Sequence, residues 1–215
     1  KIRQDNTNDP HLLGKGDIKK LLVQYSLPAI LGMVITSLYH IVDGIFIGHG
    51  IGALALSGLA VTFPIMNILA AFSTLIGVGG ATLTSIRLGE RDEEGARSIL
   101  GHVTILNAAN SILLCSITYI FLDPILILFG ANELLLPYAR DFMSVYLIGT
   151  PVVFVFIALN NIMRVTGYPQ KAMLSSFITV IVNIILAPIF IFVLGWGMKG
   201  TALATVLSQL VGLIW

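Results

Sequence analysis

The feature that most constrains this chain is a series of long segments that contain no Asp, Glu, Lys or Arg. A helix needs about 20 apolar residues to cross a bilayer of roughly 30 Å. Four charge-free segments are long enough, residues 21–48 carry only one such charged residue, and residues 200–215 are charge-free but short. We therefore predict an all-α membrane protein with six transmembrane helices, at about 21–48, 53–86, 98–122, 140–163, 171–194 and 200–215, the last of them truncated.

The composition and the first residues support this class. Hydrophobic residues make up 56% of the chain and charged residues 11%, against about 25% charged residues in a soluble domain. The first apolar run is too long for the apolar core of a signal peptide, which has about 7–15 residues. We expect residues 1–20 to be a cytoplasmic N-terminus with a short interfacial lead-in. The chain starts with Lys1 and stops within an apolar run, so we expect it to be part of a longer protein.

The basic residues predict an orientation. The first 20 residues contain five Lys or Arg, the loop around 87–97 has three and the loop around 164–171 has two, whereas the other side has only Arg140 and Lys199. Positive loops stay inside, which predicts a multi-pass protein of the cell membrane with a cytoplasmic N-terminus. The partner is the lipid bilayer. Nucleic acid is not expected, because no basic patch with interleaved aromatic residues is found.

Asp43 is the acid that needs an explanation. It is the one acid among eleven that lies within a span, where a charge costs from about 2.5 to more than 10 kcal/mol. Tyr39 is four residues earlier, on the same helix face. A carboxylate with amide and hydroxyl oxygens can bind Na⁺ or manage a proton. Other spans supply such groups at Asn107, Asn110, Asn160, Asn161, Asn183, Thr205 and Gln209.

Two plainer interpretations stay open at this point. Asp43 is about five residues, roughly 7 Å, from the end of its span, and it can be an interfacial acid. Asn and Thr in membrane helices commonly form interhelical hydrogen bonds. No nucleophilic triad and no phosphate-binding glycine loop is found, so we expect neither an enzyme nor a cofactor.

Three segments carry a resemblance to a known family. "LPAILGMVITSLYHIVDGIFIG", "NNIMRVTGYPQKAM" and "VNIILAPIFIFVLGWGMKGTALATVLSQ" resemble the multidrug and toxic compound extrusion (MATE) family, especially its bacterial DinF-like branch, and the likeness runs from about residue 18 to the end. The resemblance implies twelve spans in two lobes of six. This chain would then be the N-terminal lobe, without its C-terminal lobe.

The resemblance also implies a site. It makes Asp43 the coupling acid of a cation or proton site, with Na⁺ or H⁺ as the coupling ion and with Na⁺ held at Asp43, Asn183 and Thr205. Where relatives read "NIILDP", this chain reads "NIILAP", so Ala187 stands in place of a second acid. Either the protein was altered there, or its coupling relies on Asp43 alone. The remaining implied residues are Tyr39 and Asn160 beside the site and Pro28 as the hinge of the first span.

The function implied is an antiporter that exports amphipathic, often cationic, drugs and toxic compounds by alternating access. One alternative is a lipid-linked oligosaccharide flippase of the same superfamily, although such proteins usually show more basic residues in their central cavity. Another is a half-lobe fragment that does not transport. The sequence leaves the substrate, the coupling ion and the oligomeric state open.

Overall fold

The computed structural model describes residues 18–215, except for the side chains of residues 18–21, 24, 25, 28, 29, 33 and 36. The predicted interfacial lead-in lies mostly outside these residues. Six helices are long and apolar enough to cross a membrane, which confirms the predicted fold class. The elements are α1 (Ile18–Gly50), α2 (Ala53–Gly89), α3 (Glu93–Ile120), α4 (Leu122–Leu128), α5 (Leu136–Val165), α6 (Pro169–Pro188), the π-helical η2 (Ile189–Val193) and α7 (Gly197–Ile214).

Local signals explain where several helices begin. The Asp92 carboxylate caps α3 by accepting a hydrogen bond from the Gly95 N–H at 2.8 Å. The Asn132 side-chain oxygen accepts from the N–H groups of Leu134 and Leu135 just before α5, and a proline lies in the first turn of α5 and of α6. A cap such as Asp92 satisfies donors that a helix start leaves free. Helix α5 has no side-chain cap and begins at Leu136, ahead of the expected 140.

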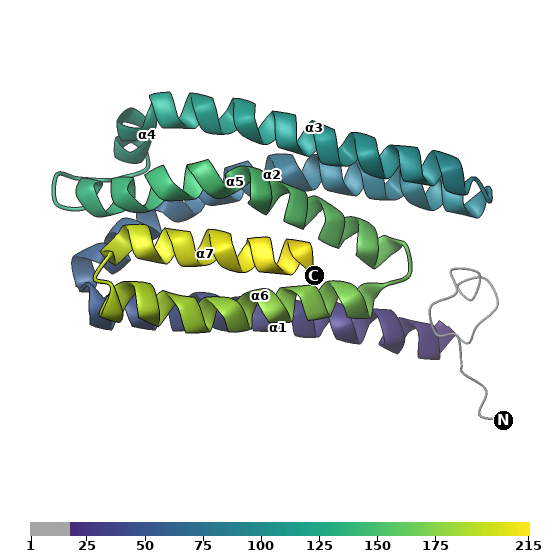
Figure 1. The fold of residues 1–215 in the computed structure, drawn as a ribbon, viewed down its shortest axis with the longest axis horizontal. Coiled ribbons are helices and arrows are strands. Elements are labelled where there is room, and N and C mark those ends of the chain that lie inside the picture. Colours follow the sequence, from purple (N-terminus) through teal and green to yellow (C-terminus); the bar gives the residue numbers. More distant parts are fainter. Residues whose placement is uncertain (1–17) are drawn as a thin grey trace.

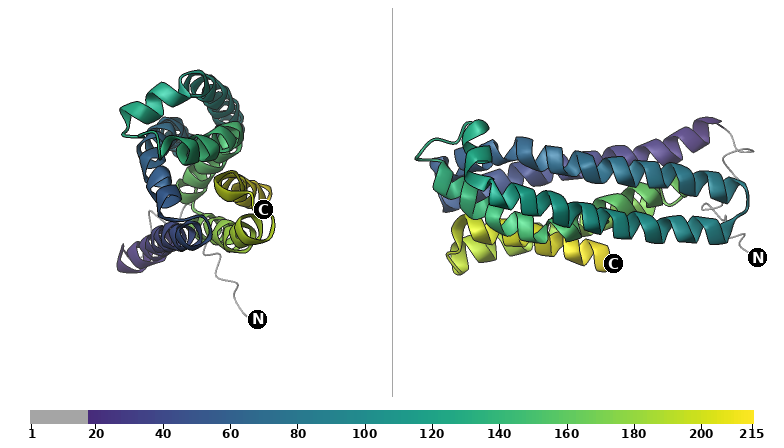
Figure 2. Two further views of the ribbon diagram at one scale, coloured as in Figure 1. Left: turned by 90° about the vertical axis from the view of Figure 1, so that its left-hand side faces the viewer. Right: turned by 90° about the horizontal axis from the view of Figure 1, so that it is seen from above.

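Helix α5 is the centre of the bundle. It packs against α2 and α3 on one side and against α7 and α6 on the other, while α1 packs mainly against α6. Figure 1 shows α3 above α5, α2 passing behind α5, and α6, α7 and α1 below it. The end-on view in Figure 2 shows the same two groups of helices joined through α5. The short α4 lies across one end, between α3 and α5 (Figure 1).

The close packing of α2 on α5 depends on a small residue. A Cβ added to Gly77 would lie 3.0 Å from the Cα of Ala158 and 3.3 Å from the Asn161 amide nitrogen. Small residues let membrane helices approach in this way. Further along α5, away from this contact, Phe142, Met143 and Phe154 are fully buried. The apolar core of the lobe therefore lies along α5 and its α2 side.

The end of α6 changes its helix type. Pro188 has no N–H to donate, and the following η2 is π-helical, with the Leu194 N–H donating to the Ile189 carbonyl at 2.9 Å. The Trp196 N–H then donates to the Phe190 carbonyl, and Gly195 and Gly197 have φ angles of 65° and 54°. Glycine adopts this left-handed conformation without steric cost. The turn sends α7 back along α6 (Figure 1), which places the expected site residues of both helices opposite each other.

Candidate functional site

A hydrogen-bonded polar layer joins α1, α6 and α7. The Tyr39 hydroxyl lies 3.0 Å from the Thr205 hydroxyl. The Asn183 amide nitrogen donates to the same Thr205 oxygen at 3.5 Å. Asn183 and Thr205 are buried, with 2% and 4% of their surface exposed. The structure thus brings together three of the residues that the sequence predicted for the site.

The Thr205 hydroxyl has a defined role in this layer. It donates to the Thr201 carbonyl at 3.2 Å, so its single proton is used. Tyr39 must then donate its own proton to Thr205, because a hydroxyl has one donor and two acceptor positions. Thr205 therefore holds Tyr39 and Asn183 in place, and in this arrangement it has no lone pair left for a cation.

Asp43 lies beside this layer and is buried, with 6% of its surface exposed. One turn separates it from Tyr39 on the same face of α1. Its Oδ1 atom is buried and has no hydrogen-bond partner within the described part of the chain. An interfacial acid would keep its carboxylate in water, whereas a buried carboxylate needs a proton, a cation or hydrogen-bond donors.

Helical spacing shows what surrounds Asp43. Residues four apart on a helix share a face. One turn from the polar layer, Asp43 follows Tyr39 on α1, Ala187 follows Asn183 on α6, and Thr201 precedes Thr205 on α7. Ala187 and Thr201 are fully buried. The next turn is apolar, with Ile47, Ile191 and Met198 all buried. Asp43 is thus placed between a polar layer and an apolar layer, with Ala187 at its own level. Thr201 was not among the predicted residues, and its place opposite Asp43 follows only from the packing of α7.

Asn160 belongs to a different hydrogen-bond network. Its amide nitrogen donates to the Ala172 carbonyl at 3.0 Å and to the Ser175 hydroxyl at 2.9 Å. Its side-chain oxygen accepts from the Arg164 Nε at 3.0 Å. This network ties the end of α5 to the start of α6, and here Asn160 is not a partner of Asp43. The predicted hinge Pro28 lies within α1, but its side chain is outside the described part of the structure.

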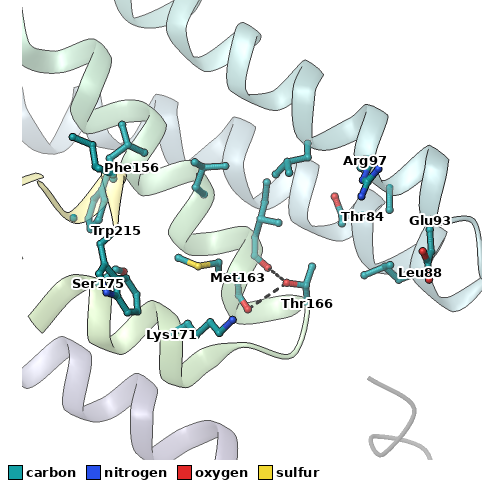
Figure 3. Close-up of a pocket in the computed structure, with 17 residues that line it drawn as sticks. Thr84, Leu88, Glu93, Arg97, Phe156, Met163, Thr166, Lys171, Ser175 and Trp215 are labelled. Atoms are coloured by element: carbon teal, nitrogen blue, oxygen red, sulfur yellow. Dashed lines mark hydrogen bonds between the residues drawn. The ribbon is translucent and has the colours of Figure 1, made fainter. Parts of the chain in front are cut away.

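Two cavities differ in their relation to this site. A small cavity of about 140 Å³ touches Tyr39 and is otherwise lined largely by polar side chains. One of these is Gln209, whose Oε1 atom is buried without a partner among the described residues. Its lining residues are Tyr39, His40, Phe156, Ser176, Thr179, Val180, Ser208 and Gln209. A larger one of about 820 Å³ lies between the α2–α3 hairpin and the α5–α6 connection (Figure 3). None of the predicted site residues lines it.

The donor set around Asp43 suits a hard ion or a proton. Carboxylate and amide oxygens bind cations that prefer oxygen ligands. The Asp43 carboxylate and the side-chain oxygen of Asn183 are the candidates, because Thr205 is fully used by its neighbours. The cavity beside Tyr39 has room for a few waters, which need polar partners of this kind.

Comparisons with known proteins agree with the fold. The MatE family matches residues 28–189. Multidrug export protein MepA of Staphylococcus haemolyticus is 31% identical over 195 residues, which cover 91% of this chain and 43% of that protein. An FAD transporter of Shewanella oneidensis is 29% identical over 209 residues, or 95% of this chain and 46% of that protein.

Solved structures place the chain in the same group. A crystal structure of MATE in the bent conformation superposes with a TM-score of 0.86 at 32% identity, covering 95% of this chain and 45% of that one. An outward-facing multidrug resistance MATE family transporter gives a TM-score of 0.86 at 32% identity, with 94% and 45% covered. The chain spans less than half the length of these relatives and corresponds to one lobe of such a transporter. It therefore belongs to the MATE family of multi-pass membrane transporters.

Proposed function

We propose that this chain is the ion-coupling lobe of an antiporter that exports amphipathic small molecules, with Asp43 as the coupling acid. The observation that carries the proposal is the buried Asp43 carboxylate, whose Oδ1 atom has no hydrogen-bond partner among the described residues. Burying a charge without a partner costs several kcal/mol. Such a position is retained at this cost where the group changes its state during function.

The polar layer explains how a change of charge reaches the helices. When a proton or Na⁺ occupies Asp43, the carboxyl group is neutral and fits between the polar layer and the apolar layer. When the ion leaves, the negative charge favours a packing of α1 that gives it water or donors. A ligand shifts such an equilibrium only by its difference in affinity for the two states. The Tyr39–Thr205 hydrogen bond links α1 to α7, so a movement of α1 would also displace α7.

The cargo is proposed from relatives and from charge. The MepA relative is named for multidrug export. On the side of the lobe opposite the basic loops, Arg140 and Lys199 are the only Lys or Arg among the described residues. Arg140 pairs with Asp123, and Lys199 pairs with Asp141. This favours amphipathic or cationic compounds over the anionic cargo of an oligosaccharide flippase. A transport path between two lobes needs both, so residues 1–215 alone should insert into a membrane without conferring drug resistance.

The proposed location is the cell membrane, with the N-terminus in the cytoplasm. Single cysteines at Glu94 and Gly167, in a Cys115→Ser background, should react with impermeant reagents only from the cytoplasmic side. A cysteine at Asn132 should react only from outside. Labelling of position 94 from outside would overturn the orientation.

The experiment that tests the coupling role uses the transporter that contains this lobe, reconstituted in vesicles. Na⁺ and H⁺ gradients are imposed separately and uptake of a cationic dye is followed. Asp43→Asn keeps the shape of the side chain but removes its charge, and we expect gradient-driven transport to be lost while expression is unchanged. Asp141→Asn, an exposed acid paired with Lys199 at 3.3 Å, is the matched control and should transport normally. Normal transport by Asp43→Asn would refute the proposal.

A further inference from the structure

A groove on the outer surface of the lobe runs between α3 and α5. It has a volume of about 480 Å³ and lies within the membrane-spanning parts of both helices. Its walls are mainly apolar. The lining residues are Ile112, Cys115, Ser116, Tyr119, Ile120, Leu147, Ile148 and Pro151.

The groove presents an apolar surface to its surroundings. Ile112, Ile120 and Ile148 are 59%, 74% and 75% exposed, which is usual for residues that face lipid. The Ser116 hydroxyl donates to the Ile112 carbonyl at 2.7 Å, and its proton is not available to an occupant. An apolar chain is therefore the chemistry that the groove accepts.

A second, polar pocket continues the groove at the end nearest α4. It has a volume of about 150 Å³ and shares Tyr119 and Ile120 with the apolar part. Its other walls include Asp123, Arg140 and Ser144. Tyrosine is enriched at the boundary between hydrocarbon and headgroups, and Asp123 at the start of α4 supplies a charged residue at the same end. The polar pocket thus lies where the headgroup of a lipid in the groove would be.

Arg140 supplies the charge at this end. Its Nε atom lies 3.4 Å from the Asp123 Oδ1 atom, and its side chain is 62% exposed. Among the described residues, Asp123 is the ion-pair partner of Arg140, and Nε is the nitrogen nearest to it. The guanidinium group binds phosphate through two parallel donors. Because Asp123 is on the Nε side, a phosphate would take the side of the terminal nitrogens.

We propose that the continuous groove is a binding site for an anionic phospholipid, with an acyl chain between α3 and α5 and the phosphate on Arg140. The apolar part of the groove would hold the acyl chain of the lipid, and the adjoining polar pocket with Arg140 would hold its headgroup. The site is separate from Asp43, which lies among α1, α6 and α7. A protein segment covering the groove is the competing occupant, and the tests below distinguish it.

The first test measures lipid retained by the purified transporter. Native mass spectrometry would follow dioleoyl phosphatidylglycerol, with dioleoyl phosphatidylcholine as the uncharged-headgroup comparison. Arg140→Gln should lower retention of phosphatidylglycerol about fivefold, the effect of one basic residue near an anionic lipid. Lys199→Gln is the matched control, because Lys199 is similarly exposed and similarly paired but lies outside the groove. Equal losses in both variants, or no loss in either, would overturn the proposal.

The second test separates the chain from the headgroup. Ile148→Trp fills the apolar part and should lower retention of both lipids at least threefold, about the effect of losing one buried methylene or more. Ile105→Trp, on a residue of α3 that is 71% exposed and lies outside the groove, should leave retention unchanged. Retention unaffected by Ile148→Trp would mean that something other than lipid, such as a protein segment, covers the groove.

A third variant guards against misfolding as the explanation. Asp123→Asn removes the carboxylate that competes for Arg140, and it should raise retention of phosphatidylglycerol about twofold without changing that of phosphatidylcholine. Poor folding cannot raise retention. An unchanged or lower value for phosphatidylglycerol would contradict the role assigned to Arg140.

Discussion

Two of the buried polar regions among the described residues differ in what their side chains can do. In the region formed by α1, α6 and α7, Asp43 has an unpartnered oxygen next to a hydrogen-bonded layer that links three helices. In the region formed by α2, α3 and α5, Asn107 is fully buried, and both of its amide atoms lack a partner among the described residues. Both positions are costly, since an unsatisfied buried polar group loses about 1–3 kcal/mol.

The neighbouring hydroxyl groups behave alike in the two regions, since Thr205 also donates to a backbone carbonyl, and the difference lies in the ionisable group. On the α2 and α3 side, the Ser73 hydroxyl donates to the Phe154 carbonyl and the Ser111 hydroxyl to the Ala108 carbonyl. These hydroxyl protons are used on backbone groups, and a neutral amide cannot change its charge. Asp43 can take up or release a proton or a cation. An unpartnered buried group is therefore a candidate ion site only where the group can change its state, which excludes the neutral amide of Asn107.

The sharpest way to break this comparison is the same substitution in both regions. Asn183→Leu should lower ion-coupled transport by about tenfold or more, because it removes an amide oxygen beside Asp43 and one donor to Thr205. Asn107→Leu should leave coupled transport within about twofold of the unaltered transporter. Rates under an imposed gradient in vesicles measure both. Equal losses would mean that the two regions act together.

A second change adds charge to the region of Asp43. Ala187→Asp places a carboxylate at the level of Asp43, one turn from Asn183, and should raise the affinity for Na⁺ about fivefold, since two carboxylates attract a cation more strongly than one. Ala187→Asn is the neutral control of the same shape. Sodium titration by calorimetry compares them. An Asn variant that binds as tightly as the Asp variant would show that charge is not the cause.

A third change compares satisfied and unsatisfied amides through stability. Asn160→Ala removes the hydrogen bonds to Ala172 and Ser175 and should lower the apparent Tm by about 3 °C. Asn107→Leu removes a group without a partner and should leave the Tm unchanged or raise it. Thermal unfolding in detergent measures both. A drop for Asn107→Leu as large as that for Asn160→Ala would indicate that water satisfies the Asn107 amide.

The smallest effect is expected at Tyr39. Tyr39→Phe removes one hydrogen bond to Thr205 while the Asn183 bond to the same oxygen remains. Interhelical hydrogen bonds in membranes are worth about 0.6 kcal/mol on average, so the Tm should fall by about 2 °C. Tyr119→Phe, on an exposed side chain of α3, is the control. An effect at Tyr39 no larger than at Tyr119 would remove the hydroxyl layer from the proposed coupling.

The sequence by itself determined the class of protein and the number of spans. In a bilayer every backbone group must be satisfied within its own helix, so a long run without charge has one stable structure whatever its neighbours are. The same reasoning singled out Asp43, because the cost of an acid in hydrocarbon does not depend on the rest of the fold. The MATE resemblance of the segments around it pointed to the same family that the comparisons show.

Only the tertiary structure decided which polar residues meet. Asn160 and Asn183 have the same chemistry, yet one binds the start of α6 and the other lies with Tyr39 and Thr205. Likewise, nothing in the sequence separated the isoleucines of the α3–α5 groove from those of the core. Lipid tails are as apolar as a protein interior, so hydropathy cannot tell the two surfaces of a membrane helix apart, and packing of the helices makes that choice.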